Sequence, residues 1–308
     1  MVEQNEIMRQ ELENRIIREL TELYETGNIK SVDKLSKEIS DIIGSPFQLS
    51  GKKYPHYNAI LVDKQTVFCH LNPGEEITEK KAQQFKRKHI DACSNKDEFI
   101  ANYYKQAVEY AEKRFKLGRE VDNFDFKQAL FLSGFPNNGI DFASEGVVDF
   151  KNNKDKQSMD CYNVLMQKTQ FEVLPYYSRK FKGIFGSLKQ SEALMAVIKP
   201  YLEELLDAVI SHPRKYVLFG SAQYVNLFRA LDKTQQLVLS RSGEVKFDIG
   251  IRFKARFEMF HLKWKGVEFC AGIAHTFPSQ ALPNAYAAMK KYGELCYQEY
   301  AKFENSIN

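Results

Sequence analysis

Polar and aromatic residues follow four short apolar runs of the sequence. Asn72 comes after the first run, Tyr176 and Tyr177 after the second, Gly220 after the third, and His275 after the fourth. In an open parallel sheet, ligands bind outside the carboxyl ends of the strands, so these residues are candidates for a binding site. An amide, two aromatic rings and an imidazole together suit a flat, polar, heteroaromatic ligand.

The four apolar runs are predicted as the strands that position these residues. They span 67–71, 171–174, 216–219 and 267–274, and a further strand is predicted over 58–62. Helical patterns follow at 187–212, 221–231 and 284–303. Alternation of mostly apolar strands with helices is typical of a parallel sheet covered on both faces. The sequence therefore predicts an α/β protein, with three α/β/α layers around a central, mostly parallel, four-stranded sheet.

The amino-terminal residues have a different pattern. Apolar residues at helical spacing run from Ile7 to Tyr24 and stop at Gly27, and a second such run from Ser31 stops at Gly44. We therefore expect a helical pair in residues 1–49, followed by the α/β domain in 50–308. Two more helices are expected at 79–90 and 97–117, and an irregular insertion at 118–168.

Composition excludes several classes of protein. The 308 residues are 44% hydrophobic and carry a net charge of +4, which indicates a folded chain and requires any basic site to be local. Five widely spaced cysteines without a C-x-x-C pair argue against a disulfide framework, a zinc knuckle or an iron–sulfur cluster. No secretory signal or membrane helix is visible, so we expect a cytoplasmic protein.

Two of the strand ends resemble motifs of the uracil-DNA glycosylase superfamily. Leu71-Asn72-Pro73-Gly74 is similar to the first catalytic motif of the mismatch-specific and single-strand-selective branches, Gly-x-Asn-Pro-Gly. Ala274-His275, followed by Pro278-Ser279, resembles the second motif, His-Pro-Ser-Pro. The likeness extends in element order over residues 60–303. His70 replaces the leading glycine of the first motif, and Thr276 and Phe277 separate His275 from Pro278.

The resemblance implies a DNA glycosylase that hydrolyses the N-glycosidic bond of a flipped uracil-type or mispaired base. Asn72 would position water and His275 would donate to the departing base, which makes these two the candidate catalytic residues. The candidates for substrate contacts, including the aromatic rings that could stack on the base, are Leu71, Pro73, Gly74, Tyr176, Tyr177, Phe277 and Ser279. The alternative is a protein of the same fold that binds nucleic acid or a nucleotide without cleaving it.

Purely structural explanations are an alternative to these roles. Asn72 could be a turn residue, and His275 a buried histidine with its hydrogen bonds satisfied. Glu75 could act as an acid or base, but a carboxylate in the first turn of a helix more often interacts with the helix dipole.

A basic strand face is the candidate nucleic-acid contact. Arg252, Lys254 and Arg256 alternate with apolar residues before the fourth strand, and the alternation shifts register at Met259-Phe260. The shift predicts two antiparallel strands with a bulge or tight turn there. The basic face could contact DNA phosphates, or protect a sheet edge from aggregation. No nucleotide-binding or hydrolase motif is present and the six histidines form no metal-binding pair, so we expect no cofactor and no metal.

Overall fold

The structure is a computed structural model that describes residues 2–57, 64–72, 74–118, 123–136, 168–178, 184–249, 254–275 and 286–307. The chain divides into two compact units. The first comprises Met1–Val62, His70–Val108 and Phe171–Ala208, and the second comprises Asp63–Cys69, Glu109–Gln170 and Val209–Asn308. Within the described residues, the chain crosses between them inside two strands and two helices. A domain boundary at residues 49–50 stays a prediction.

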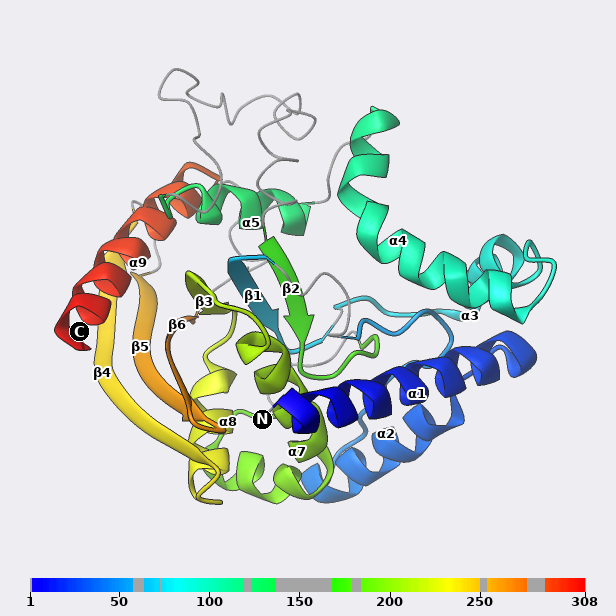
Figure 1. The fold of residues 1–308 in the computed structure, drawn as a ribbon, viewed down its shortest axis with the longest axis horizontal. Helices are drawn as coiled ribbons and strands as arrows, with labels where there is room; N and C mark the ends of the chain where they lie inside the picture. The colour runs from blue at the N-terminus through cyan, green and yellow to red at the C-terminus, as the bar shows by residue number, and fades with distance from the viewer. Residues whose placement is uncertain are drawn as a thin grey trace. The chain divides into compact units, whose positions relative to one another are not determined.

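A mixed, mostly parallel sheet lies at the centre of the second unit (Figure 1). Its strands are β1 (Thr66–His70), β2 (Lys168–Glu172), β3 (Tyr216–Phe219), β4 (Leu237–Asp248), β5 (Lys254–Trp264) and β6 (Val267–Ala274). Their order across the sheet is β2-β1-β3-β6-β5-β4, with β1, β3 and β6 parallel neighbours. The predicted α/β class is confirmed, but the described sheet has six strands rather than four because β5 and β4 extend it.

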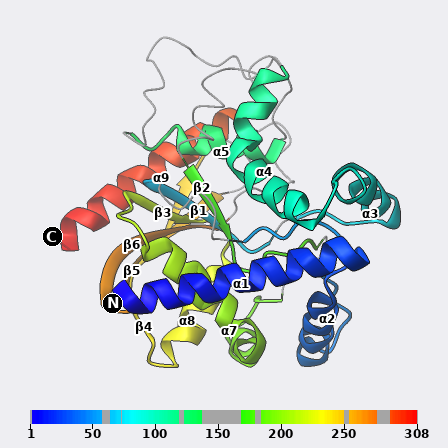
Figure 2. The ribbon, with the colours of Figure 1, turned by 45° about the vertical axis from the view of Figure 1, so that its right-hand side comes forward.

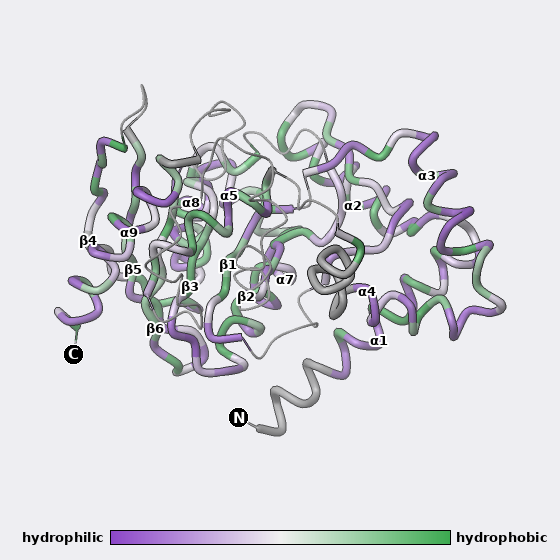
Figure 3. The backbone as a smooth tube through the Cα atoms, turned by 90° about the horizontal axis from the view of Figure 1, so that it is seen from above, coloured by the Kyte–Doolittle hydropathy of each residue, from purple (hydrophilic) through white to green (hydrophobic). Residues whose placement is uncertain are grey.

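Burial explains which strands the sequence predicts well. Every residue of β1 and β3 is buried, as expected for strands covered on both faces, and hydrophobic residues dominate both (Figure 3). β2 begins three residues earlier than predicted, with Lys168, Thr169 and Gln170. These polar residues fit the core because the ammonium of Lys168 donates to the side-chain oxygens of Gln128 and Gln170. The strand predicted at 58–62 lies outside the described residues.

β4 and β5 form a long antiparallel pair at the edge of the sheet, and β5 pairs with β6. The predicted break at Met259-Phe260 is wrong, because β5 is one continuous strand. The irregularity belongs to its partner: the register shifts between Arg241 and Gly243 of β4, opposite those two residues. Gly243 adopts φ +104°, a conformation that favours glycine at such a bulge. Met259 and Phe260 are both buried, although consecutive residues of a continuous strand point to opposite faces of the sheet.

Three of the described helices accompany the sheet in the second unit: α5 (Asn123–Leu132), α8 (Gln223–Asp232) and α9 (Tyr286–Ile307). α9 contacts β4, β5 and β6 and runs along these strands (Figure 1), and α8 contacts β4. α5 contradicts the prediction of an irregular segment from residue 118 onward; residues 137–167 of that segment lie outside the described residues. α5 and α9 approach closely: Gly293 of α9 lies against the backbone of Phe131 in α5, and Gly134, just after α5, lies against the backbone of Gly293 and Glu294.

The first unit is largely helical. It contains α1 (Val2–Thr26), α2 (Lys30–Ile43), α3 (Glu79–Phe85), a π-helix (Lys86–Ile90), and most of α4 (Lys96–Lys116) and α7 (Leu188–Ile210). The predicted amino-terminal helices are confirmed, with Gly44 as the left-handed residue that ends α2. α1 and α2 lie side by side (Figures 1 and 2), and the amide of Lys30 donates to the carboxylate of Glu22. The predicted helix over 79–90 is two segments, α3 and the π-helix.

Candidate functional site

The loop after β1 carries the first predicted motif and belongs to the first unit. Asn72 donates through its side-chain Nδ2 to the carbonyl oxygens of Tyr176 and Ser178, each at 3.3 Å. The amide of Leu174 donates to the carbonyl of Leu71 at 2.9 Å. The loops after β1 and β2 are therefore joined by side-chain and backbone bonds. These two hydrogen bonds use the side-chain nitrogen of Asn72. Holding a water molecule would use its side-chain oxygen, so the two roles involve different atoms.

A group of charged and aromatic residues surrounds this loop. Glu75 pairs with the ammonium groups of Lys53 and Lys81, each at 2.9 Å, and Lys53 lies 4.8 Å from the ring centroid of Tyr177. The Tyr177 hydroxyl bonds to Nε2 of His56 at 2.7 Å. Burial raises the pKa of Glu75, but the two lysines outweigh it and hold the pKa below its usual value. Tyr177 is half-buried here, and it is the accessible member of the predicted aromatic pair.

The helix-dipole explanation for Glu75 is wrong. α3 begins only at Glu79, where the Thr78 side chain accepts from the amide of Lys81 as an N-cap. Glu75 lies before this cap, and its partners are lysine side chains rather than helix amides. Gly74 is exposed in the same stretch, and Pro73 lies outside the described residues.

Tyr176 lies in the core of the first unit. Its ring is buried, and its hydroxyl donates to Glu19 at 2.9 Å and bonds to the Tyr57 hydroxyl at 2.8 Å. The Tyr57 hydroxyl also contacts Glu19, at 2.6 Å, and the Arg15 guanidinium lies over the Tyr57 ring. Tyr176 thus ties α1 to the loop after β2, and this position explains its burial without a ligand.

Glu19 makes this network sensitive to pH. Burial raises the pKa of its carboxyl group, although hydrogen bonds from Tyr57 and Tyr176 and the charge of Arg15 oppose the rise. Glu19 is therefore harder to deprotonate in the folded protein than in the unfolded chain. Its contribution to stability is fully present below pH 4.5, the ordinary pKa of the group, and is lost as pH rises through the pKa of the folded state.

We expect Glu19→Gln to reduce this loss. Glutamine keeps the shape and a carbonyl acceptor for the tyrosines, so melting curves from pH 4 to 8 should be flatter for the variant, by at most about 1.4 kcal/mol per pH unit. Glu11→Gln, an exposed change on the same helix, is the control. Parallel curves for wild type and Glu19→Gln would contradict the assignment.

His275, the second predicted catalytic residue, belongs to the second unit. It directly follows β6, and its backbone amide donates to the carbonyl of Arg256 in β5 at 3.1 Å. Nε2 lies 2.8 Å from Oε1 of Glu258, and the two side chains are only 10% and 3% exposed. The two side chains are thus close together and shielded from water, although Nε2 makes no hydrogen bond within the described residues.

Glu258 and Glu244 are functional candidates that sequence reasoning missed. The strand pattern places Glu258 with Arg256 on a solvent-facing basic surface, but Glu258 is buried. Glu244 lies directly opposite it on β4, and Arg256 lies 3.5 Å from Glu244. A signal was present in the sequence, because Glu258 is a single charge inside the apolar run Phe257–Phe260. Strand periodicity does not reveal its burial, because the pattern does not show what packs on each face of the strand.

The remaining predicted residues are described only in part. Arg256 is half-exposed on β5, and its guanidinium is close to Glu244. Lys254 begins β5, and its side chain is not among the described ones. Arg252, Phe277 and Ser279 lie outside the described residues. The basic strand surface therefore stays a prediction, with Arg256 as its described member.

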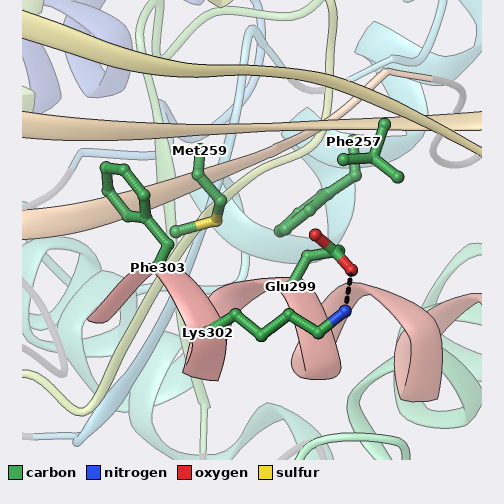
Figure 4. A pocket seen from close by; sticks show the side chains of 6 residues that line it. Phe257, Met259, Glu299, Lys302 and Phe303 are labelled. Carbon is green, nitrogen blue, oxygen red and sulfur yellow. Dashed lines mark hydrogen bonds and ion pairs between the residues drawn. The ribbon is translucent and has the colours of Figure 1, made fainter. Parts of the chain in front are cut away.

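Two shallow pockets lie away from these residues. One, of about 190 Å³, lies between α9 and strands β4 and β5 and is lined by Val245, Phe257, Met259, Glu299, Lys302 and Phe303 (Figure 4). The other, of about 380 Å³, lies beside α3 and is lined by Lys80, Gln84, Arg87 and Lys88. Neither pocket is lined by a predicted site residue. The first is mostly apolar apart from the Glu299–Lys302 ion pair at 2.7 Å.

Comparison of the chain with family models, with curated protein sequences and with solved structures finds no match. Among the described helices, none is both long enough and apolar enough to cross a membrane.

Proposed function

We propose that this protein hydrolyses the N-glycosidic bond of a uracil-type or mispaired base in DNA. The observation that supports it most is the order of strands and motifs. Asn72 lies two residues after β1 and His275 directly follows β6, and β1, β3 and β6 are parallel neighbours in one sheet. This is the order expected from the resemblance to uracil-DNA glycosylases. With it we infer that the sheet forms the middle of three α/β/α layers.

The proposed reaction breaks the bond between the sugar and the base, and water adds to the sugar carbon. The base leaves with negative charge, and the sugar passes through an oxocarbenium-like state. Asn72 would hold the attacking water through its side-chain oxygen. His275, which lies beside Glu258, would donate a hydrogen bond to the departing base. This hydrogen bond would stabilise the negative charge that develops on the base.

Other predicted residues would bind the substrate. Tyr177 would stack on the flipped base, because its ring is half-buried, whereas Tyr176 is buried in the core. Phe277 is the second candidate for stacking. Leu71, Pro73, Gly74 and Ser279 would line the base, and Arg252, Lys254 and Arg256 would contact phosphates.

A non-catalytic binding protein of the same fold is the second candidate. One observation favours it: Asn72 donates to the carbonyls of Tyr176 and Ser178, which is sufficient reason for an asparagine in a structural loop. Such a protein would keep the sheet and its basic residues and would lack the chemistry.

A cleavage assay distinguishes the two. The full chain is incubated with single- and double-stranded DNA that contains uracil, other deaminated bases or T·G mispairs, and alkali then cuts abasic sites. Base release from at least one substrate is the expected result. DNA binding without cleavage on every substrate would favour the binding protein, and the absence of both would overturn both proposals.

A further inference from the structure

Three side chains from adjacent strands converge at one place in the second unit. Glu244 comes from β4, Glu258 from β5, and His275 directly follows β6. One ligand atom from each, a carboxylate oxygen or an imidazole nitrogen, lies within 4.8 Å of the others. Two carboxylates and one imidazole are a donor set that first-row divalent metals accept.

The contact between His275 and Glu258 is short but poorly aligned for a hydrogen bond. Nε2 lies 2.8 Å from Oε1, yet it makes no hydrogen bond to any described residue, and the side chain is nine-tenths buried. Two ligands bonded to one cation at about 2.1 Å, at roughly a right angle, lie about 3 Å apart. In that arrangement the lone pairs of the imidazole nitrogen and of the carboxylate oxygen both point to the cation. A hydrogen on the same nitrogen would not point at that oxygen. A short distance without a hydrogen bond therefore fits two ligands that share an ion.

Charge also favours a cation here. Glu244 and Glu258 are directly opposite each other in the β4–β5 ladder, and like charges in such a pair are destabilising. Among the described side chains, Glu244 pairs with Arg256 at 3.5 Å and Lys246 at 3.7 Å, and both are about half exposed. They interact with the outer carboxylate and are screened by water. A divalent ion would neutralise the buried carboxylate of Glu258 more effectively.

We propose that Glu244, Glu258 and His275 bind a divalent transition-metal ion, such as Mn²⁺, Co²⁺ or Zn²⁺. Glu258 and His275 form the buried half of the site. Glu244, whose side chain is 24% exposed, completes the site. Two ligand atoms bonded to one ion at about 2.1 Å lie at most about 4.2 Å apart, so a small rotation of the Glu244 side chain brings atoms that now lie within 4.8 Å into range. The remaining coordination positions would hold water.

This inference goes beyond the proposed function, although both use His275. In the proposed function Nε2 lies against Glu258, so an ion on Nε2 would replace that contact and change the charge of the ring. The two proposals are therefore measured separately. Cleavage is therefore measured with a chelator present, and ion binding is measured without DNA. Failure of one proposal leaves the other intact.

Direct titration tests the site. Chelator-treated full-length protein is titrated with Mn²⁺, followed by electron paramagnetic resonance of the free ion, and with Co²⁺, followed by visible absorption. We expect one ion per chain. Glu258→Gln and His275→Ala should each raise Kd at least about tenfold, since removing even an outer-shell partner has this effect. Glu244→Gln, at the more exposed ligand, serves if the buried variants fail to fold.

An exposed pair on the same two strands supplies the control. His261 on β5 lies 3.5 Å from Glu268 on β6, and both are partly open to solvent. His261→Ala and Glu268→Gln should leave the Kd for Mn²⁺ and Co²⁺ unchanged. The proposal is wrong if the wild-type chain binds neither ion, or if the control variants weaken binding as much as the variants at the site do.

Discussion

Asn72→Ala and His275→Ala are each expected to slow base release by roughly 100-fold or more in single-turnover assays, while DNA affinity stays nearly unchanged. Under the proposed function, both groups act on atoms that change charge only as the bond breaks. Asn72 would orient the water, and His275 would stabilise the charge on the departing base. Interactions made only in the transition state affect the rate and leave binding of the intact substrate unaltered.

His261→Ala is the matched control for this experiment. It removes an imidazole from β5 in the same sheet, at a residue that is not proposed to touch substrate. Its single-turnover rate should equal that of the wild type, with a chelator in every reaction. Folding of each variant is checked by its melting temperature, because Asn72 also fastens its loop to Tyr176 and Ser178. A fully active Asn72→Ala or His275→Ala enzyme would overturn that residue's role.

Gly293→Ala is expected to have the largest effect on stability. A Cβ at this position would lie 1.9 Å from the carbonyl oxygen of Phe131, and one at Gly134 would lie 2.2 Å from the amide nitrogen of Glu294. α5 and α9 touch backbone to backbone there, so relief requires the helices to separate. We expect the free energy of unfolding to fall by about 3 kcal/mol. The gain in helix propensity from alanine, about 1 kcal/mol, is smaller.

Urea unfolding of the wild type, Gly293→Ala and Gly74→Ala measures this effect. A Cβ added at Gly74 would meet no other atom within 4 Å, and the backbone there is not left-handed. The Gly74→Ala variant should therefore unfold at nearly the wild-type midpoint. Equal midpoints for all three proteins would show that the α5–α9 crossing tolerates a methyl group and would refute the close approach.

Local patterns were sufficient for the elements whose residues alternate or repeat regularly. The apolar runs that became β1 and β3 were predicted almost to the residue, because strands buried on both faces are mostly apolar. β6 was also predicted correctly, although only its second half is buried. α1 and α2 were predicted because each has one apolar face and ends at a glycine with positive φ. The predicted start of β2 was three residues too late because its first residues, from Lys168 to Gln170, are polar. Lys168 is accommodated by hydrogen bonds to Gln128 in α5 and to Gln170 within the strand.

Other features depend on residues far apart in the chain. The bulge predicted in β5 lies in β4, because a register shift is a property of a strand pair and either partner can carry the extra residue. Tyr176 is buried by Glu19 and Tyr57, which are more than a hundred residues earlier. Glu258 is interpreted from its own strand as solvent-facing, yet it is buried, and the pairing of β5 with β6 brings it close to His275. Strand periodicity states which residues share a face, but only the packing of distant parts of the chain decides whether that face meets water, and only the pairing of strands decides which side chains meet on it.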